Sequence, residues 1–295
     1  MKDTLIHAIS ANGHIRVLTC TSTQLAEQAR KQHDLWPTSA AALGRVLTIT
    51  AILGSMLKTD KEKVTVQING GGPIGTIMAD GWANGDVRGF VGDPEIYLKY
   101  NDTGKLAVGT AVGKDGYLKV IKRMNMKNDF TGQVALVSGE IAEDVTAYFA
   151  ESEQIPTACA LGVLVQGGSG EVLTAGGYLI QLLPDAGEDT IDKVERGLQR
   201  VGYVTGHLKQ GKSALELIRD VLGEFEIEVL ETCPVEYRCY CSRERVVRAL
   251  ISMGTQEMKN LIEEQGQAEM TCQFCDRVYR FNQEELEEIL KQMQP

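Results

Sequence analysis

Basic charge and long apolar runs are both scarce in this sequence of 295 residues. Its 30 lysines and arginines are outnumbered by 40 aspartates and glutamates, and the net charge is −10, which disfavours a general partner of nucleic acid or of anionic membranes. Residues 1–20 show no apolar core flanked by basic residues, so we expect no secretory signal. The longest apolar run, residues 40–57, contains Arg45 and several hydroxyl side chains and is short for a bilayer span. We therefore predict a buried helix there and no membrane partner.

Catalytic motifs are missing as well. The sequence has no HExxH motif, no Walker lysine loop and no serine, histidine and aspartate order that spacing supports. Gly70, Gly72 and Gly75 match the G-x-G-x-x-G pattern, but Pro73 lies inside it and strand-like residues follow where a helix should begin. We interpret these glycines as a structural turn, and we expect that the protein is not an enzyme.

Four of the seven cysteines form two close pairs, Cys239 with Cys241 and Cys272 with Cys275. Thirty residues lie between the pairs, a pattern typical of a four-thiolate metal site. Such soft ligands suit zinc or an iron centre best, and all four histidines lie outside this stretch. The sequence therefore predicts one zinc ion per chain, with Cys239, Cys241, Cys272 and Cys275 as its ligands.

The other three cysteines fall outside this pattern. Cys20 and Cys159 have apolar or strand-like neighbours and are predicted to be small core residues. Cys233 is predicted to lie at the end of a strand, although a spare ligand or an oxidation partner is an alternative. Free thiols or metal ligands, in a chain without a secretory signal, indicate a reducing compartment, so we expect a cytoplasmic location.

The first part of the chain reads as hairpins and a few helices. Residues 4–10 and 14–21 flank Asn12-Gly13, a strong hairpin signal. One of residues 21–23 can cap a helix that ends near His33, and Thr38 or Ser39 can cap a second helix after Pro37. Strands are expected between residues 63 and 121, with turns at Asn84-Gly85 and Asp115-Gly116. A helix over 142–152 and strands over 158–166 and 171–182 complete an α+β pattern.

The character of the sequence changes after Pro184. Apolar residues at helical spacing predict one helix, and Ser213 with Glu216 forms a capping-box pattern that opens a second. Glycines 202, 206 and 211 separate the two. We predict an N-terminal α+β domain over 1–183, a helical linker over 184–232 that packs on it, and a small zinc-binding domain over 233–295. Asn282 is expected to cap the last helix of that domain, residues 283–293.

Sulfur chemistry leaves two roles open for the metal site. It can be purely structural, or oxidants can attack the thiolates and turn ligands into disulfides. A bridge between Cys272 and Cys275 has ordinary spacing, whereas one between Cys239 and Cys241 would be strained and easily reduced.

The predicted zinc-binding segment is acidic, with eight lysines and arginines against eleven aspartates and glutamates from Pro234 to Pro295. A basic nucleic-acid face is therefore not expected.

The cysteine motifs also carry a family resemblance. Cys239-Tyr-Cys241-Ser-Arg-Glu-Arg and Cys272-Gln-Phe-Cys275, with Tyr279 and Phe281, resemble the redox-switch module of the 33 kDa chaperonin (heat shock protein 33) family. Leu43-Gly44-Arg45, the glycines near residue 70 and the two-helix linker fall where that family has similar elements.

The resemblance implies a cytosolic, ATP-independent holdase chaperone that is reduced, zinc-bound and inactive at rest. It further implies that oxidation releases zinc and forms the disulfides Cys239–Cys241 and Cys272–Cys275. The module and the linker then unfold and expose a surface that binds unfolding client proteins, often as a homodimer. Two alternatives remain: a thiol-disulfide oxidoreductase that uses Cys272 and Cys275, which would turn over a small disulfide, and a zinc-ribbon nucleic-acid-binding protein, which the acidic balance disfavours.

Overall fold

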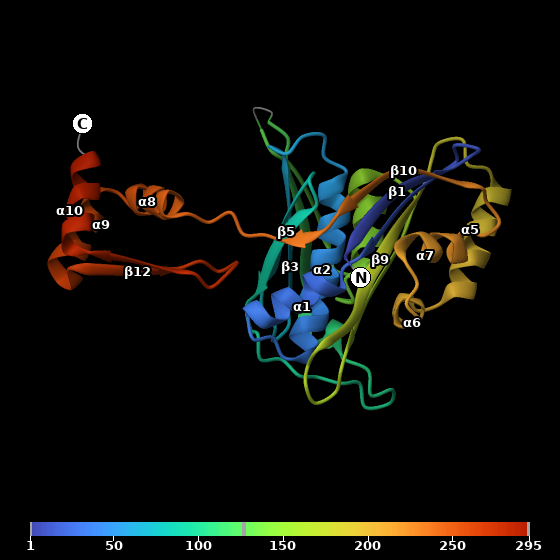
Figure 1. The fold of residues 1–295 in the computed structure, drawn as a ribbon, viewed down its shortest axis with the longest axis horizontal. Helices are drawn as coiled ribbons and strands as arrows, with labels where there is room; N and C mark the ends of the chain where they lie inside the picture. Colours follow the sequence, from blue (N-terminus) through green and yellow to red (C-terminus); the bar gives the residue numbers. More distant parts are fainter. Residues whose placement is uncertain (1, 126–127, 294–295) are drawn as a thin grey trace. The chain divides into compact units, whose positions relative to one another are not determined.

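The computed structural model describes residues 2–125 and 128–293, and the chain divides into two compact units, Met1–Arg238 and Cys239–Pro295 (Figure 1). The first unit holds two mainly antiparallel sheets with helices packed on them. Among the described residues, the second unit holds one hairpin and three helices. This mixture of helices and hairpins confirms the predicted α+β class.

Two sheets organise the first unit. The first sheet has the strand order β10-β1-β2-β9-β8, and the second sheet has the order β11-β5-β4-β3-β6-β7. Neighbouring strands are antiparallel except for β11 and β5, which run parallel. The strands of the first sheet are β1 (Thr4–Ser10), β2 (Ile15–Thr21), β8 (Thr157–Val165), β9 (Val172–Leu182) and β10 (Ile227–Pro234). Those of the second sheet are β3 (Lys63–Gly71), β4 (Ile77–Trp82), β5 (Asp86–Val91), β6 (Gly113–Arg123), β7 (Phe130–Ala135) and β11 (Glu236–Tyr237).

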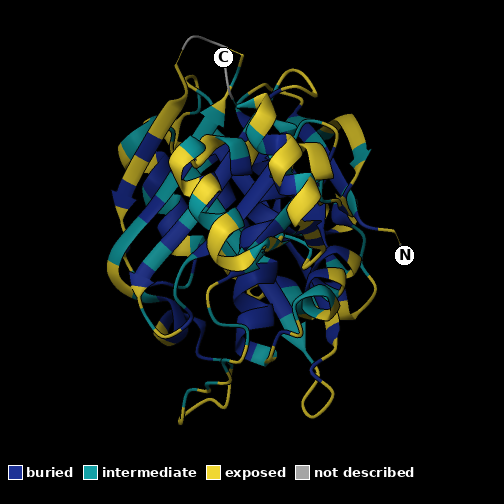
Figure 2. Cartoon of the chain, turned by 90° about the vertical axis from the view of Figure 1, so that its left-hand side faces the viewer, coloured by how far each residue is buried: buried dark blue, intermediate teal, exposed yellow. Residues whose placement is uncertain are grey.

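Helix α2 (Pro37–Ser55) contacts strands of both sheets and forms the centre of the core. By length and composition it could cross a membrane, but 89% of its apolar stretch is buried inside the protein. Small residues permit this position, since a Cβ on Gly44 would lie 2.9 Å from a methyl group of Val163 and 3.2 Å from Ala26. The predicted buried helix is confirmed, and Figure 2 shows buried residues gathered on the inner strands and helices.

Several local predictions are confirmed. The β1–β2 hairpin surrounds Asn12-Gly13, and Asn84-Gly85 connects β4 to β5. Strands β8 and β9 pair as a hairpin, and α1 (Thr23–Gln32) begins directly after Ser22. The helix predicted over 142–152 is α-helical only from Ala142 to Tyr148 (α4) and continues as a π-helix, Phe149–Glu153.

Two predictions are wrong, and both errors have a tertiary cause. Asp115 and Gly116 form no turn but lie inside β6, where a Cβ on Gly116 would come within 1.9 Å of the carbonyl oxygen of Asn69. This glycine therefore serves close strand packing. Thr38 and Ser39 do not cap α2, because Trp36 holds that position. Their hydroxyls donate instead to the carbonyl oxygens of Leu98 and Asp93, both at 2.9 Å, and so fix residues 93–98 beside the helix.

Three helices cover the outer face of the first sheet, and we call them the helical segment: α5 (Glu188–Val201), α6 (Val204–Lys209) and α7 (Ala214–Val221). The capping box of Ser213 and Glu216 is present as predicted. Helix α6 is not predicted, because it lies among the glycines interpreted as separators. The segment packs on the sheet through apolar side chains, among them Val194, Val201, Leu208, Leu217, Ile218 and Leu222 against Ile6, Ala8, Val17, Tyr178 and Ile180.

The second unit has a small core of its own. Its elements are α8 (Arg243–Ser252), α9 (Thr255–Gln265), β12 (Gln267–Thr271), β13 (Val278–Asn282) and α10 (Gln283–Gln292). The predicted cap of the last helix is confirmed, since Asn282 forms a capping box with Glu285. Its buried apolar side chains are Leu250, Met258, Tyr279, Phe281, Leu286 and Ile289. A core of this size gives limited stability to a unit of fewer than sixty residues.

Candidate metal centre

Four cysteine sulfurs meet at one end of the second unit. The Sγ atoms of Cys239, Cys241, Cys272 and Cys275 all lie within 4.8 Å of one another. The Cys239–Cys272 and Cys241–Cys275 sulfurs are 3.7 Å and 3.3 Å apart. A tetrahedron with zinc–sulfur distances near 2.3 Å requires sulfurs about 3.8 Å apart. The four thiols therefore fit a four-sulfur metal site without rearrangement of the backbone.

The turn between β12 and β13 places two of the sulfurs. The Cys272 N–H donates to the carbonyl oxygen of Arg277 (3.0 Å), and the N–H groups of Cys275 and Asp276 donate to that of Cys272 (3.2 and 2.8 Å). Asp276 adopts a left-handed backbone (φ 53°), which closes the turn. The Cys272 sulfur accepts the N–H of Phe274, and the Cys275 sulfur accepts that of Arg277. The turn thus holds both sulfurs on one side.

The other two sulfurs lie where the chain enters α8. Cys241 directly precedes Ser242, the N-cap, whose Oγ accepts the N–H of Arg245 at 3.3 Å. This cap ends the extended chain and starts the helix. Cys239 and Cys241 alternate with Tyr240 in that extended chain, which lets both sulfurs point to the same side.

Hydrogen bonding distinguishes one thiol from the others. Burial raises the pKa of Cys241, but the Tyr279 hydroxyl, which donates to its sulfur at 3.1 Å, and the neighbouring thiols outweigh burial and bring that pKa to about 7. Burial raises the pKa values of Cys272 and Cys275. Deprotonating Cys272 and Cys275 at neutral pH thus needs a strong positive charge such as a bound metal ion. The sequence pattern includes Tyr279 but gives no sign of this hydrogen bond.

All seven cysteines are in the thiol form. The shortest sulfur contacts given above join one cysteine of each pair to one of the other pair, as shared metal ligation requires. Disulfides within the pairs, Cys239–Cys241 and Cys272–Cys275, stay a prediction.

The remaining cysteines lie in the first unit. Cys20 is buried on β2, and Cys159 is half-buried against the same core, so both predictions as core residues are confirmed. Cys233 lies on β10 opposite Leu5, whose carbonyl oxygen is 3.8 Å from its sulfur. The strand prediction for Cys233 is therefore confirmed as well. Burial raises the pKa of all three thiols.

The glycine motif near residue 70 is structural, as predicted. A Cβ on Gly70 or Gly72 would lie 2.2 Å or 2.3 Å from the carbonyl oxygen of Gly113 or Ala111, and Gly75 has a left-handed backbone (φ 68°). The backbones pack too closely for any other residue, and no helix begins at the motif. It therefore lacks the helix N-terminus that a dinucleotide site requires.

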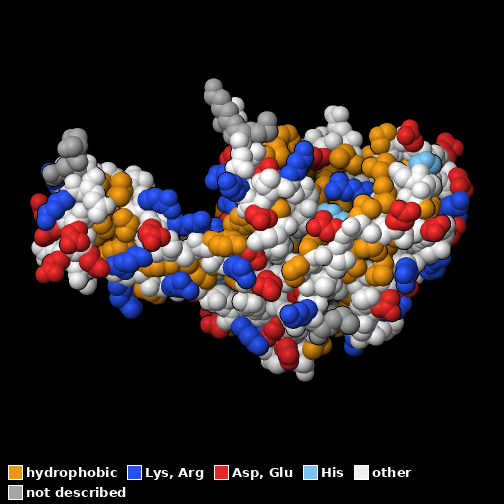
Figure 3. Space-filling view, turned by 45° about the horizontal axis from the view of Figure 1, so that its top comes forward, with side chains coloured by type: hydrophobic (Ala, Val, Ile, Leu, Met, Phe, Trp, Pro, Cys, Tyr) orange, Lys and Arg blue, Asp and Glu red, His pale blue; other side chains and the backbone are white. Residues whose placement is uncertain are grey.

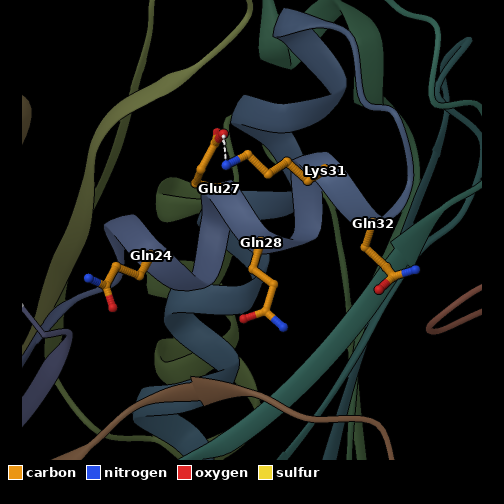
Figure 4. Close-up of a pocket in the computed structure, with 5 residues that line it drawn as sticks. All are labelled: Gln24, Glu27, Gln28, Lys31 and Gln32. Carbon is orange, nitrogen blue, oxygen red and sulfur yellow. Dashed lines mark ion pairs between the residues drawn. The ribbon is translucent and has the colours of Figure 1, made fainter.

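Two described surface features of the first unit do not resemble a small-molecule or nucleic-acid site. The hollow shown in Figure 4 is lined by one face of α1, with Gln24, Gln28 and Gln32 around the ion pair of Glu27 and Lys31 (3.4 Å). These polar side chains do not form the apolar pocket typical of a small-molecule site. On the face that Figure 3 shows, acidic and basic side chains are interspersed, which is not the basic stripe of a nucleic-acid binder.

Comparisons with known proteins show extensive similarity to one family. A family model described as "Hsp33 protein" matches residues 3–282. The 33 kDa chaperonin of Clostridioides difficile (strain 630) is 46% identical over 293 residues, which cover 99% of this chain and 100% of the relative. The 33 kDa chaperonin of Geobacillus sp. (strain WCH70) is 44% identical over 289 residues, which cover 98% of this chain and 97% of the relative.

A solved structure is similar over the same extent. The crystal structure of the 33 kDa chaperonin (heat shock protein 33 homolog) from Thermotoga maritima has a TM-score of 0.88 and 33% identity and covers 99% of this chain and 98% of its own. The sequence matches include both the sheets and the four-cysteine unit. The chain therefore belongs to the Hsp33 family of 33 kDa chaperonins.

Proposed function

We propose that this protein is a redox-regulated, ATP-independent holdase chaperone of the cytoplasm, and not an enzyme. The observation that carries the proposal is the four-cysteine cluster, with all sulfurs within 4.8 Å, in a unit with a small core. When bound by the four thiolates, one zinc ion per chain would cross-link the start of α8 to the β12–β13 turn and add to the stability of that unit.

Oxidation of the cysteines is the proposed trigger. In each pair, Cys239 with Cys241 and Cys272 with Cys275, two thiols lose two electrons and two protons and form one sulfur–sulfur bond, while one hydrogen peroxide is reduced to two water molecules. Sulfurs in a disulfide no longer act as thiolate ligands. The second unit then retains only its six-residue core and unfolds.

The first sheet supplies the proposed surface for clients, and the helical segment covers it. Its contacts with the first sheet are largely apolar, so the sheet face beneath it, with Ile6, Val17, Tyr178 and Ile180, becomes exposed when the segment leaves. An exposed apolar face of this kind binds the apolar surface of unfolding proteins. We propose that residues 184–232 act as the mobile linker between a client-binding domain (1–183) and the redox domain (233–295), and that the active form is a homodimer.

One experiment tests the proposal as a whole. Zinc release and suppression of a client's thermal aggregation are measured on the reduced protein before and after peroxide with mild heat. We expect about one zinc per reduced chain, its release on oxidation, and suppression only afterwards. Equal suppression by reduced and oxidised protein would contradict the redox gate. Turnover of a small disulfide with a thiol reductant, measured in the same samples, would favour an oxidoreductase instead.

A further inference from the structure

The twelve residues 227–238, which we call the strap, connect the helical segment to Cys239 and are hydrogen-bonded to both sheets. Strand β10 pairs with β1 along the edge of the first sheet, from Ser10↔Ile227 to Thr4↔Pro234. Strand β11 then pairs in parallel with β5 at the edge of the second sheet. Figure 1 shows the strap running from the helices across β1 to β5. Along the chain, a disturbance that begins at the metal centre reaches the helices through the strap.

The strap fits closely against the second sheet. The N–H groups of Glu236 and Arg238 donate to the carbonyl oxygens of Gly85 (3.1 Å) and Val87 (2.9 Å). A Cβ on Gly85 would lie 2.0 Å from the carbonyl oxygen of Pro234, and Gly85 has a left-handed backbone (φ 83°). Only glycine accommodates this approach without displacing the strap.

One side chain anchors the end of the strap two residues before the first metal ligand. Tyr237 is 8% exposed and belongs to the main core of the first unit. Its hydroxyl donates to the carbonyl oxygen of Gly89 (2.9 Å) and lies 3.0 Å from Nε2 of His33. The two rings meet edge to face, with centroids 6.4 Å apart. Leaving this site exposes an aromatic ring and breaks its hydrogen bond to the carbonyl oxygen of the buried Gly89.

The helical segment lacks polar anchors of comparable burial on its sheet. Its ion pairs are internal: Lys193 with Asp189 (2.6 Å), Arg196 with Glu224 (2.9 Å) and Lys212 with Asp220 (2.5 Å). Nδ1 of His207 also lies 2.8 Å from a carboxylate oxygen of Asp220. Contact with the sheet is largely apolar. The segment can therefore leave as one body once its flanking chain yields, and the strap is the flanking chain on the side of the metal centre.

We propose that the Tyr237 anchor is a brake that confines structural loss to residues 239–295 when the metal centre is lost. While Tyr237 stays in place, the strap stays paired and the helical segment stays packed. Release of the anchor lets the loss spread through β11 and β10 to the helices. This inference rests on the proposed function, because it assigns to one residue the coupling between the redox unit and the helical segment.

The test measures coupling rather than stability alone. Full-length wild type, Tyr237→Phe and Tyr237→Ala are compared with the control Tyr97→Ala, which removes a 45% exposed tyrosine of the same unit. Amide hydrogen exchange is followed in the second unit, the strap and the helical segment, with zinc bound and after chelation under reducing conditions. Zinc content is measured in every sample.

In wild type and the control, chelation should speed exchange in the second unit and change exchange in the helical segment by less than about twofold. In Tyr237→Ala it should speed exchange in the strap and the helical segment by about tenfold or more, with Tyr237→Phe in between. Equal acceleration with and without zinc would show a merely structural role and overturn the brake. The brake would also be overturned if chelation left amide exchange in the helical segment of Tyr237→Ala unchanged.

These readouts do not require chaperone activity. If no zinc is found and chelation changes nothing in the second unit, the proposed function fails before the brake is tested. The brake alone fails under another outcome: zinc binds and chelation speeds exchange in the second unit, but exchange in the helical segment stays unchanged in all variants. In both cases the inference is overturned, but for different and distinguishable reasons.

Discussion

Ile218→Asp offers a direct test of the helical segment as a gate. Ile218 is 1% exposed and packs with the apolar face of the first sheet, whereas the main core around α2 does not include it. Removing the buried isoleucine and burying an unpaired carboxylate should together destabilise the packed segment by about 4 kcal/mol. That shifts the balance between packed and open segment by about a thousandfold.

The matched control places the same aspartate at the next, exposed position, Arg219→Asp. Its cost should stay below about 1 kcal/mol, since it replaces a favourable charge near the end of α7 with an unfavourable one at an exposed position. Both variants are assayed for suppression of a client's thermal aggregation under reducing conditions, with zinc content and circular dichroism to show that the fold persists. Ile218→Asp should suppress aggregation without oxidation, and Arg219→Asp should behave as wild type.

Two outcomes would refute the reasoning. If Ile218→Asp stays folded, binds zinc and protects the client no better than wild type, the segment is not the gate. If Arg219→Asp protects equally well, added negative charge and not uncovering of the sheet is responsible. Ile218→Ala, with an expected loss of about 2–4 kcal/mol and no new charge, separates these two readings.

Three further predictions concern the metal centre and one ion pair. Cys→Ser at any of the four clustered cysteines should abolish tight zinc binding, whereas Cys159→Ser should leave about one zinc per chain by metal analysis. Tyr279→Phe removes the hydroxyl that donates to Cys241, so zinc affinity by competition with a chelator should fall about tenfold. The hydrogen bond from Arg30 lowers the pKa of Glu27 to about 2. The stabilisation by this hydrogen bond is therefore complete above the ordinary pKa of a glutamate and is lost as pH falls towards 2. In unfolding measurements, acid should destabilise wild type more steeply than Glu27→Gln.

The sequence predicts the four-cysteine cluster well, because residues suited to share one ion leave a local pattern. Two cysteines close in sequence already place two sulfurs near one point, and the turn at Cys272 needs little help from the rest of the fold. The hydroxyl of Tyr279 is different, since its contact with Cys241 depends on how β13 packs against the chain before α8. Periodicity reveals that Tyr279 faces a core, but not which atom its hydroxyl meets.

The fold was predictable where elements pair with their neighbours along the chain, as in the β1–β2 and β8–β9 hairpins. It was not predictable where distant segments meet. Strand β11 spans only Glu236–Tyr237, too short for any period, and exists because β5 accepts it. Thr38 and Ser39 have residue types that often cap helices, yet their hydroxyls donate to backbone carbonyl oxygens within residues 93–98. The sequence pattern places Gly206 in the separation between two helices. This residue lies instead inside α6, whose Val204 and Leu208 are buried.

Both ends of the helical segment are fixed near the same hairpin turn. The Leu183 N–H donates to the carbonyl oxygen of His14 (2.9 Å), and the Ala11 N–H donates to that of Glu226 (2.8 Å). While these bonds persist, an opened segment remains tethered over its own sheet face at an effective concentration of order millimolar. A client at micromolar concentration would then have to bind that face about a thousand times more tightly than the segment does. Lifting of an intact segment should therefore recruit clients poorly, unless its packing is weakened by about a thousandfold, as Ile218→Asp is expected to do. Under the proposed function, activation should therefore be stronger when the helices also lose their amphipathic shape than when they lift intact.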